Sequence, residues 1–155
     1  MKKLLLFSFI LLGIVILNAC KKKNEDPPKD DTNGKTKAQL LTQKNWKIAA
    51  LMSGSSDIWS NPILVPACNK DNEYRFRTDD SLAQYEKTNK CNSSDPDSVV
   101  SSYKLYNNTH LIINLRLTSS TTLNDTAEIT ELNESTLKLN TEYSGFPASI
   151  TFNHP

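Results

Sequence analysis

The pattern that most constrains this chain is strict alternation between apolar and polar residues. It is clearest over residues 110–117, where Leu111, Ile113 and Leu115 alternate with polar side chains and Ile112 alone breaks the rule. Successive side chains of a β-strand point to opposite faces, so this pattern predicts a strand with one buried face. Similar alternation recurs over residues 46–50, 73–77, 103–105, 136–143 and 150–152.

Short polar links join these predicted strands, for example residues 78–81, 107–109 and 133–135. Short links favour antiparallel neighbours, hence a meander. The predicted fold class is all-β: an up-and-down barrel of about eight strands around one core, which leaves no exposed strand edge. A short helix is expected at Lys37–Lys44, with Leu40 and Leu41 on one side. A two-sheet sandwich is the alternative that alternation leaves open.

The first predicted strand carries Trp46, Ile48 and Ala50 on its buried face. An aromatic side chain buries a large apolar area. We therefore expect Trp46 to plug one end of the barrel.

The N-terminus has the features of an export signal. Met1-Lys2-Lys3 is basic, and the apolar run from Leu4 to Leu17 would span roughly 21 Å as a helix, short of the roughly 30 Å of a bilayer core. The run ends in Leu17-Asn18-Ala19-Cys20, which resembles the lipobox of bacterial lipoproteins. This resemblance implies removal of residues 1–19 and lipidation of Cys20. Cleavage elsewhere, leaving a spare cysteine, is the alternative.

Residues 20–36 are expected to form a disordered tether, because they contain no large apolar residue and include the pair Pro27-Pro28. The domain proper is then residues 37–155. Acyl chains on Cys20 would provide a stable membrane anchor. We therefore expect an outer-membrane lipoprotein, on the periplasmic face or the cell surface.

Charge and composition exclude several function classes. The net charge of the full chain is +1, and without Lys2 and Lys3 the balance is 16 basic against 17 acidic side chains. Binding to nucleic acid needs a clear cationic excess, so it is not expected. Four glycines and two histidines argue against a glycine-rich nucleotide loop and a multi-histidine metal site.

Two further cysteines, Cys68 and Cys91, follow the predicted export signal. An even pair in an exported protein favours a disulfide, which would close a loop of about 24 residues. A metal-binding or nucleophilic role is the alternative, although neither cysteine belongs to a Cys-x-x-Cys pair.

Several stretches resemble the lipocalin-like domain of small Gram-negative lipoproteins. They are Leu40-Leu41-Thr42 with Trp46-Lys47-Ile48, residues 66–76 from Pro66-Ala67-Cys68 to Phe76, residues 103–105 with 110–113, and residues 129–132 with 137–139. Together they cover most of residues 37–152. The resemblance implies an up-and-down barrel and a disulfide between Cys68 and Cys91. The chain departs from the lipocalin pattern at Lys44, two residues before Trp46, at Asp79-Asp80, and in having no arginine near the C-terminus to stack on Trp46.

The candidate ligand-binding residues lie in a long link and on two strands. The link from Ser53 to Ala67 carries apolar side chains, and a long link within a compact domain is often functional. We expect Trp59, Ile63 and Val65 to line or cover a pocket at the barrel mouth; the alternative is that they simply seal the core. Tyr85 and Tyr103 are candidates to supply hydroxyl groups to a ligand.

No arrangement typical of catalysis or metal binding is legible. His110 and His154 have no partner in sequence and are expected to be solvated, and the acidic pairs Asp79-Asp80 and Asp95-Pro96-Asp97 fit turn chemistry. We therefore expect a monomeric, noncatalytic binding module without a cofactor, which takes a small apolar or amphipathic ligand. The alternative is an interaction or inhibitor protein that binds a protein or glycan through its loops.

Overall fold

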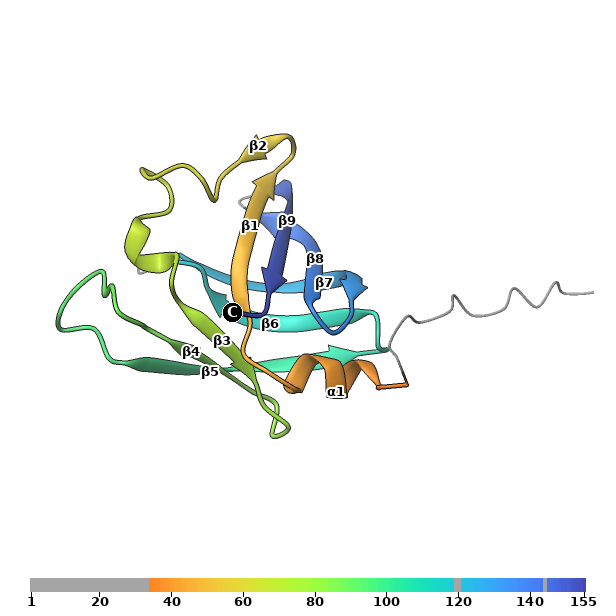
Figure 1. Cartoon of the computed structure of the whole chain (residues 1–155). Helices are drawn as coiled ribbons and strands as arrows, with labels where there is room; N and C mark the ends of the chain where they lie inside the picture. The colour runs from red at the N-terminus through yellow and green to blue at the C-terminus, as the bar shows by residue number, and fades with distance from the viewer. Residues whose placement is uncertain (1–33, 119–120, 144) are drawn as a thin grey trace, which may run out of the picture.

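The computed structural model of the chain describes residues 34–118, 121–143 and 145–155. The predicted signal peptide, Cys20 and nearly all of the predicted tether lie outside the described residues. In the described part a helix precedes a series of strands (Figure 1). The elements are α1 (Lys37–Thr42), β1 (Lys47–Ser53), β2 (Ser56–Asp57), the 3-10 helix η1 (Ala67–Asn69), β3 (Glu73–Phe76), β4 (Ser81–Tyr85), β5 (Ser98–Tyr106), β6 (His110–Arg116), β7 (Thr122–Leu132), β8 (Thr136–Tyr143) and β9 (Phe146–Asn153).

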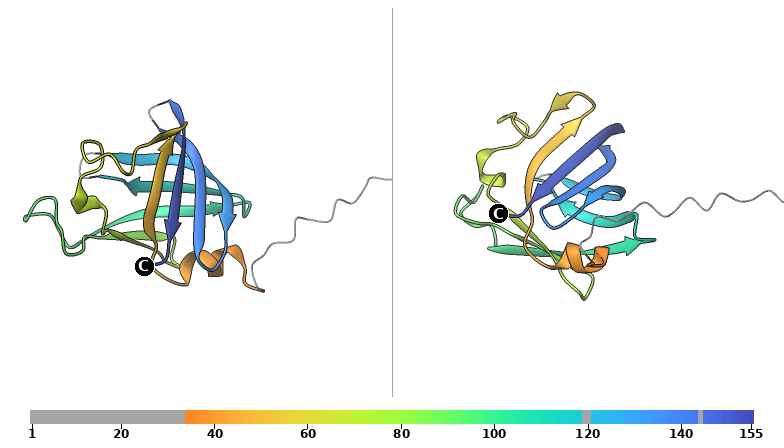
Figure 2. Two further views of the ribbon diagram at one scale, coloured as in Figure 1. Left: turned by 45° about the horizontal axis from the view of Figure 1, so that its top comes forward. Right: turned by 45° about the vertical axis from the view of Figure 1, so that its right-hand side comes forward.

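The strands form one antiparallel sheet in the order β2-β1-β9-β8-β7-β6-β5-β4-β3. The sheet curls so that its two ends approach each other (Figure 2). They meet at a bridge between Trp46 and Tyr74, whose backbone amides each donate to the other's carbonyl at 2.7 Å. The predicted all-β, lipocalin-like architecture is confirmed. The nine strands form a half-barrel, and the single Trp46–Tyr74 bridge connects its two ends near α1.

The short helix closes the joined end of the barrel. Thr36 caps α1 in a reciprocal arrangement, because its hydroxyl accepts from the Gln39 amide while the Gln39 side chain accepts from the Thr36 amide. Leu40 and Leu41 are buried in the core, and the Trp46 indole donates to the Leu41 carbonyl at 2.8 Å. Trp46 is completely buried, as expected of a plug at one barrel end.

The expectation that His154 is solvated was wrong. Its ring lies against the Trp46 indole with centroids 4.0 Å apart, and its Nδ1 lies 2.7 Å from the Asn45 carbonyl. Because a carbonyl only accepts, Nδ1 carries the proton and donates. His154 therefore covers Trp46 from the C-terminal end of the chain, where the sequence has no arginine to do so.

Two β-bulges change which side chains face the core. The register between β1 and β9 shifts between Ile48 and Ala50, so that Leu51 rather than Ala50 is buried. The expectation for Ala50 was wrong for this reason, since an inserted residue reverses the alternation beyond it. A second shift, between Ile129 and Glu131, places Leu132 in the core.

The disulfide between Cys68 and Cys91 is present, with Cα atoms 5.0 Å apart. It joins η1 to the long connection between β4 and β5, so two loops at the end of the barrel opposite α1 are held together (Figure 1). Across the described residues, no helix has the length and apolar character needed to cross a membrane.

Candidate ligand-binding site

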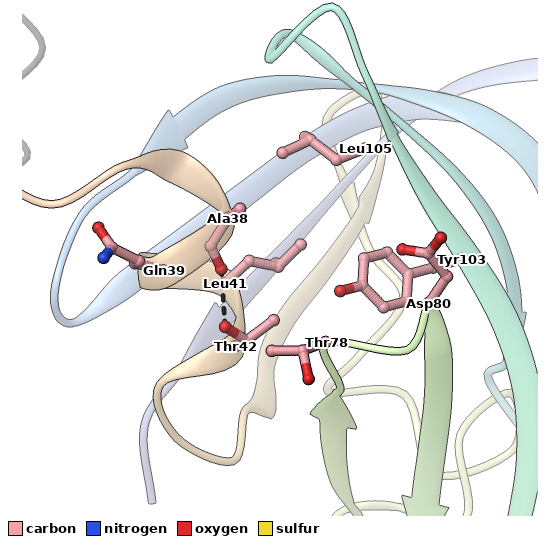
Figure 3. A pocket seen from close by; sticks show the side chains of 8 residues that line it. All are labelled: Ala38, Gln39, Leu41, Thr42, Thr78, Asp80, Tyr103 and Leu105. Carbon is pink, nitrogen blue, oxygen red and sulfur yellow. Dashed lines mark hydrogen bonds between the residues drawn. The ribbon is translucent and has the colours of Figure 1, made fainter.

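A groove of about 210 Å³ lies between α1, the β3–β4 turn and β5. Leu41 of α1 and Tyr103 of β5 point toward one another across it (Figure 3), and both are buried. Polar side chains of the helix and of the turn complete the lining, which consists of Ala38, Gln39, Leu41, Thr42, Thr78, Asp80, Tyr103 and Leu105. The groove therefore has an apolar floor and a polar rim.

Tyr103 is fixed within the groove by contacts on both sides. Its hydroxyl donates to the Arg77 carbonyl at 2.7 Å, and its ring meets the edge of Phe76 with centroids 4.9 Å apart at 88°. Burial raises the pKa of the phenol, and the nearby Asp80 and Asp79 carboxylates raise it further. Tyr103 is thus a neutral, preorganised part of the groove.

The rim of the groove is acidic at the β3–β4 turn. Asp79 accepts from the Ser81 hydroxyl at 2.6 Å and from the Ser81 amide at 3.1 Å, and these hydrogen bonds lower the pKa of Asp79. Asp80 adopts a left-handed backbone with φ of 61°, which lets its carbonyl accept from the Tyr103 amide at 2.9 Å. The expected turn role of this acidic pair agrees with these hydrogen bonds.

The structure does not bring the five predicted ligand residues to one place. Tyr103 lines the groove at the α1 end. Tyr85 lies opposite Glu73 on β3, and its hydroxyl accepts from Arg77 Nη2 at 3.0 Å. Trp59 is half-buried and packs on the core, Val65 is buried, and Ile63 is 88% exposed.

The link from Ser53 to Ala67, which carries Trp59, Ile63 and Val65, packs mainly against the core of the barrel. The amides of Ile58 and Trp59 both donate to the Leu51 carbonyl, and both side chains lie against the core. The Asn61 side chain accepts from the amides of Ile63 and Leu64, at 2.9 and 3.4 Å. Trp59 and Val65 thus contribute to sealing this end of the barrel, while Ile63 and Leu64 remain outside.

A set of buried polar side chains near this end was missed by the sequence reasoning. Asn72 and Glu86 are buried, with Asn72 Nδ2 3.5 Å from Glu86 Oε1, and Gln84 is buried beside them on β4. Burial raises the pKa of Glu86, because it disfavours the charged form, although Arg116 acts in the opposite direction. Because the buried polar side chain of Gln84 interrupts the apolar alternation, the pattern did not predict β4.

Two further features of the described residues bear on binding. A shallow groove of about 450 Å³ is lined mostly by polar residues of β7 and β8, including Asp125 and Glu142. Asp125 accepts from the Thr141 hydroxyl at 2.7 Å, which lowers its pKa. Among the residues described, no cluster of three or more histidine, cysteine, aspartate or glutamate side chains is placed to hold a metal ion.

Comparison with known protein families shows which family the chain belongs to. The sequence matches the lipocalin-like domain over residues 42–139, a span that runs from the end of α1 into β8. The chain belongs to the lipocalin-like domain family. Proteins of this family are generally binding proteins, so membership points to a binding function at the level of the class. A comparison with curated proteins found no match.

Proposed function

We propose that this lipocalin-like protein is an outer-membrane lipoprotein, anchored through an acylated Cys20, whose domain binds a small apolar or amphipathic ligand without converting it chemically. The observation that supports a ligand of this kind is the groove between α1 and β5. It combines the apolar surfaces of Leu41, Tyr103 and Leu105 with hydroxyl, amide and carboxylate groups at its rim. Such a lining suits a ligand with an apolar part and a polar head.

The size and charge of the groove narrow the ligand class. Its volume of about 210 Å³ is below the roughly 300–1,000 Å³ of pockets for drug-sized ligands, so it suits a slim chain or a small ring. Asp80 lines the rim and Asp79 lies beside it. We infer that the polar head is neutral or cationic, since an anionic head would meet like charge.

A titration with three probes of one chain length tests this proposal. We expect octan-1-ol and octylamine to bind saturably, and octanoate to bind more weakly. Ala38→Phe, which places a ring in the groove, should abolish binding of all three, while the control Lys44→Phe should not. Asp80→Asn should reduce the discrimination against octanoate. Equal binding by the Ala38→Phe variant would overturn the assignment of the groove.

The membrane anchor is tested separately. Labelled palmitate should be incorporated into the chain, and the chain should fractionate with the outer membrane. Cys20→Ala should prevent both, whereas Cys68→Ala should leave lipidation intact. Labelling that persists in Cys20→Ala would contradict the anchor.

One observation favours a second function, the binding of a protein or glycan partner through the loops. Ile63 and Leu64 are 88% and 51% exposed on the link whose neighbouring residue Val65 is buried. The side chain of Asn61 braces this apolar pair by accepting from both backbone amides. If this function holds, Ile63→Ser with Leu64→Ser should release a partner captured on the wild-type chain, and Ala38→Phe should retain it.

A further inference from the structure

The wall of the barrel opens between β5 and β6. The two strands pair from Tyr103–Ile113 to Tyr106–His110, whereas the first half of β5 pairs with β4. Beyond the paired region the Ser101 hydroxyl, instead of the backbone ladder, reaches β6 and donates to the Asn114 carbonyl at 2.7 Å. A cavity of about 100 Å³ occupies this opening, and the exposed residues Asn114 and Thr122 form part of its lining.

Gln84 projects into this cavity with an unsatisfied side-chain amide. It is 5% exposed, and neither Nε2 nor Oε1 has a hydrogen-bond partner among the described residues. Exchanging the two amide atoms changes nothing, because both lack a partner. A buried amide without partners is unfavourable, and native proteins rarely leave both of its atoms in that state. Leu82, Val99 and Leu115 form the apolar part of the cavity lining, and Ser101, Asn114, Arg116 and Thr122 form its polar part.

We propose that this opening is a binding site for a carboxamide group, held by a paired hydrogen bond to the side-chain amide of Gln84. An amide presents one donor and one acceptor side by side, which is the complement of what Gln84 offers. A carboxylate would satisfy Nε2 and set oxygen against oxygen at Oε1, but it would also meet the cationic side chain of Arg116, which lines the same cavity. The cavity exceeds the roughly 30 Å³ share of one water molecule, which leaves space for a small planar group.

This site goes beyond the proposed function, because its lining residues differ from those of the groove beside α1. The site is reached through the barrel wall at Asn114 and Thr122. It therefore admits an amide-bearing ligand independently of an alkyl chain bound beside Tyr103.

The test uses the full chain, labelled with ¹⁵N in detergent solution and titrated with acetamide, acetone and acetate. Acetamide should shift the NMR signals of the Gln84 side-chain amide and of the Val99 and Leu115 backbone amides saturably. The dissociation constant should lie in the millimolar range expected for so small a probe. Acetone, which lacks the donor, should bind at least about tenfold more weakly. Acetate loses the hydrogen bond at Oε1 but meets Arg116, so acetone is the deciding comparison. Gln84→Met should weaken acetamide binding by a similar factor, and the control Gln43→Met, at the end of α1 and outside the cavity lining, should leave it unchanged.

Several results would overturn the proposal. They are the absence of saturable shifts with acetamide, equal affinity for acetone, and wild-type affinity in a folded Gln84→Met variant. A crystal structure in acetamide showing ordered water alone on Gln84 would do the same. The comparison of probes on the wild-type chain decides the question even if the variant does not fold. Octan-1-ol binding beside α1, measured on the same sample, reports on the proposed function independently.

Discussion

Replacing Cys68 and Cys91 together by serine should destabilise the domain substantially. The cysteines are 23 positions apart, so the disulfide closes a loop of about 24 residues in the unfolded chain. The chain-entropy relation gives about 3.4 kcal/mol at 25 °C for such a loop. With a urea dependence of about 2 kcal/mol/M, the unfolding midpoint should fall by roughly 1.7 M.

The assay is urea unfolding of the oxidised wild-type and double-serine chains, followed by tryptophan fluorescence. Wild-type protein treated with a reductant is the control, and its midpoint should move close to that of the variant. Trp46 lies at the opposite end of the barrel, so its own contribution to the folded-state fluorescence should be nearly unchanged, whereas Trp59 lies in the link that leads to Cys68. A loss below about 1 kcal/mol, or a wild-type midpoint insensitive to reductant, would refute the view that this bond restrains the loops.

Three further predictions concern single side chains. His154→Ala removes a ring contact with Trp46 and a hydrogen bond to the Asn45 carbonyl, so urea unfolding should show a loss of about 1–2 kcal/mol; an unchanged midpoint would contradict this role. Burial raises the pKa of Glu86, so wild-type stability is lost as pH rises from the usual glutamate range through the raised pKa. Glu86→Gln should therefore gain stability relative to wild type as pH rises above the usual glutamate range of about 4, measured as urea midpoints, and a gap independent of pH would oppose it. The pKa shift of Asp125 has the opposite sign, because the hydrogen bond from the Thr141 hydroxyl lowers it. Wild-type stability is therefore lost as pH falls below about 4, and the Asp125→Asn variant should lose less stability over the same range. Parallel acid-unfolding curves would count against this.

The fold was predictable where apolar alternation is unbroken. Within the stretch 110–117, His110–Arg116 form β6, with Leu111, Ile113 and Leu115 buried and Ile112 facing outward. The short helix with Leu40 and Leu41 buried was also as expected, although it ends at Thr42 rather than Lys44, and so was the disulfide. In these segments the residues that pack and the residues that are solvated differ in polarity, so the pattern reports the structure directly.

The sequence was less informative where inward positions are polar or where the register shifts. Gln84 interrupts the apolar pattern of β4, and Asp125 lies midway along β7, so neither strand was delimited. The bulge after Ile48 reverses the faces of β1, and bulges leave no mark in composition.

The candidate site was only partly predictable, for a related reason. Tyr103 was identified as a site residue, but the groove depends on α1 packing beside the β3–β4 turn, a contact between segments distant in sequence. The cavity at Gln84 likewise depends on where the pairing between β5 and β6 stops. Neither position is encoded by local spacing.

The most direct test of binding by this domain is a crystal structure of the chain grown with octan-1-ol. We predict electron density for the alkyl chain between Leu41 and Tyr103, with the hydroxyl at the rim near Thr78 and Asp80. Density for the alkyl chain beside Trp59 with the groove empty, or no bound alcohol at saturating concentration, would contradict the assignment of this groove as the ligand site.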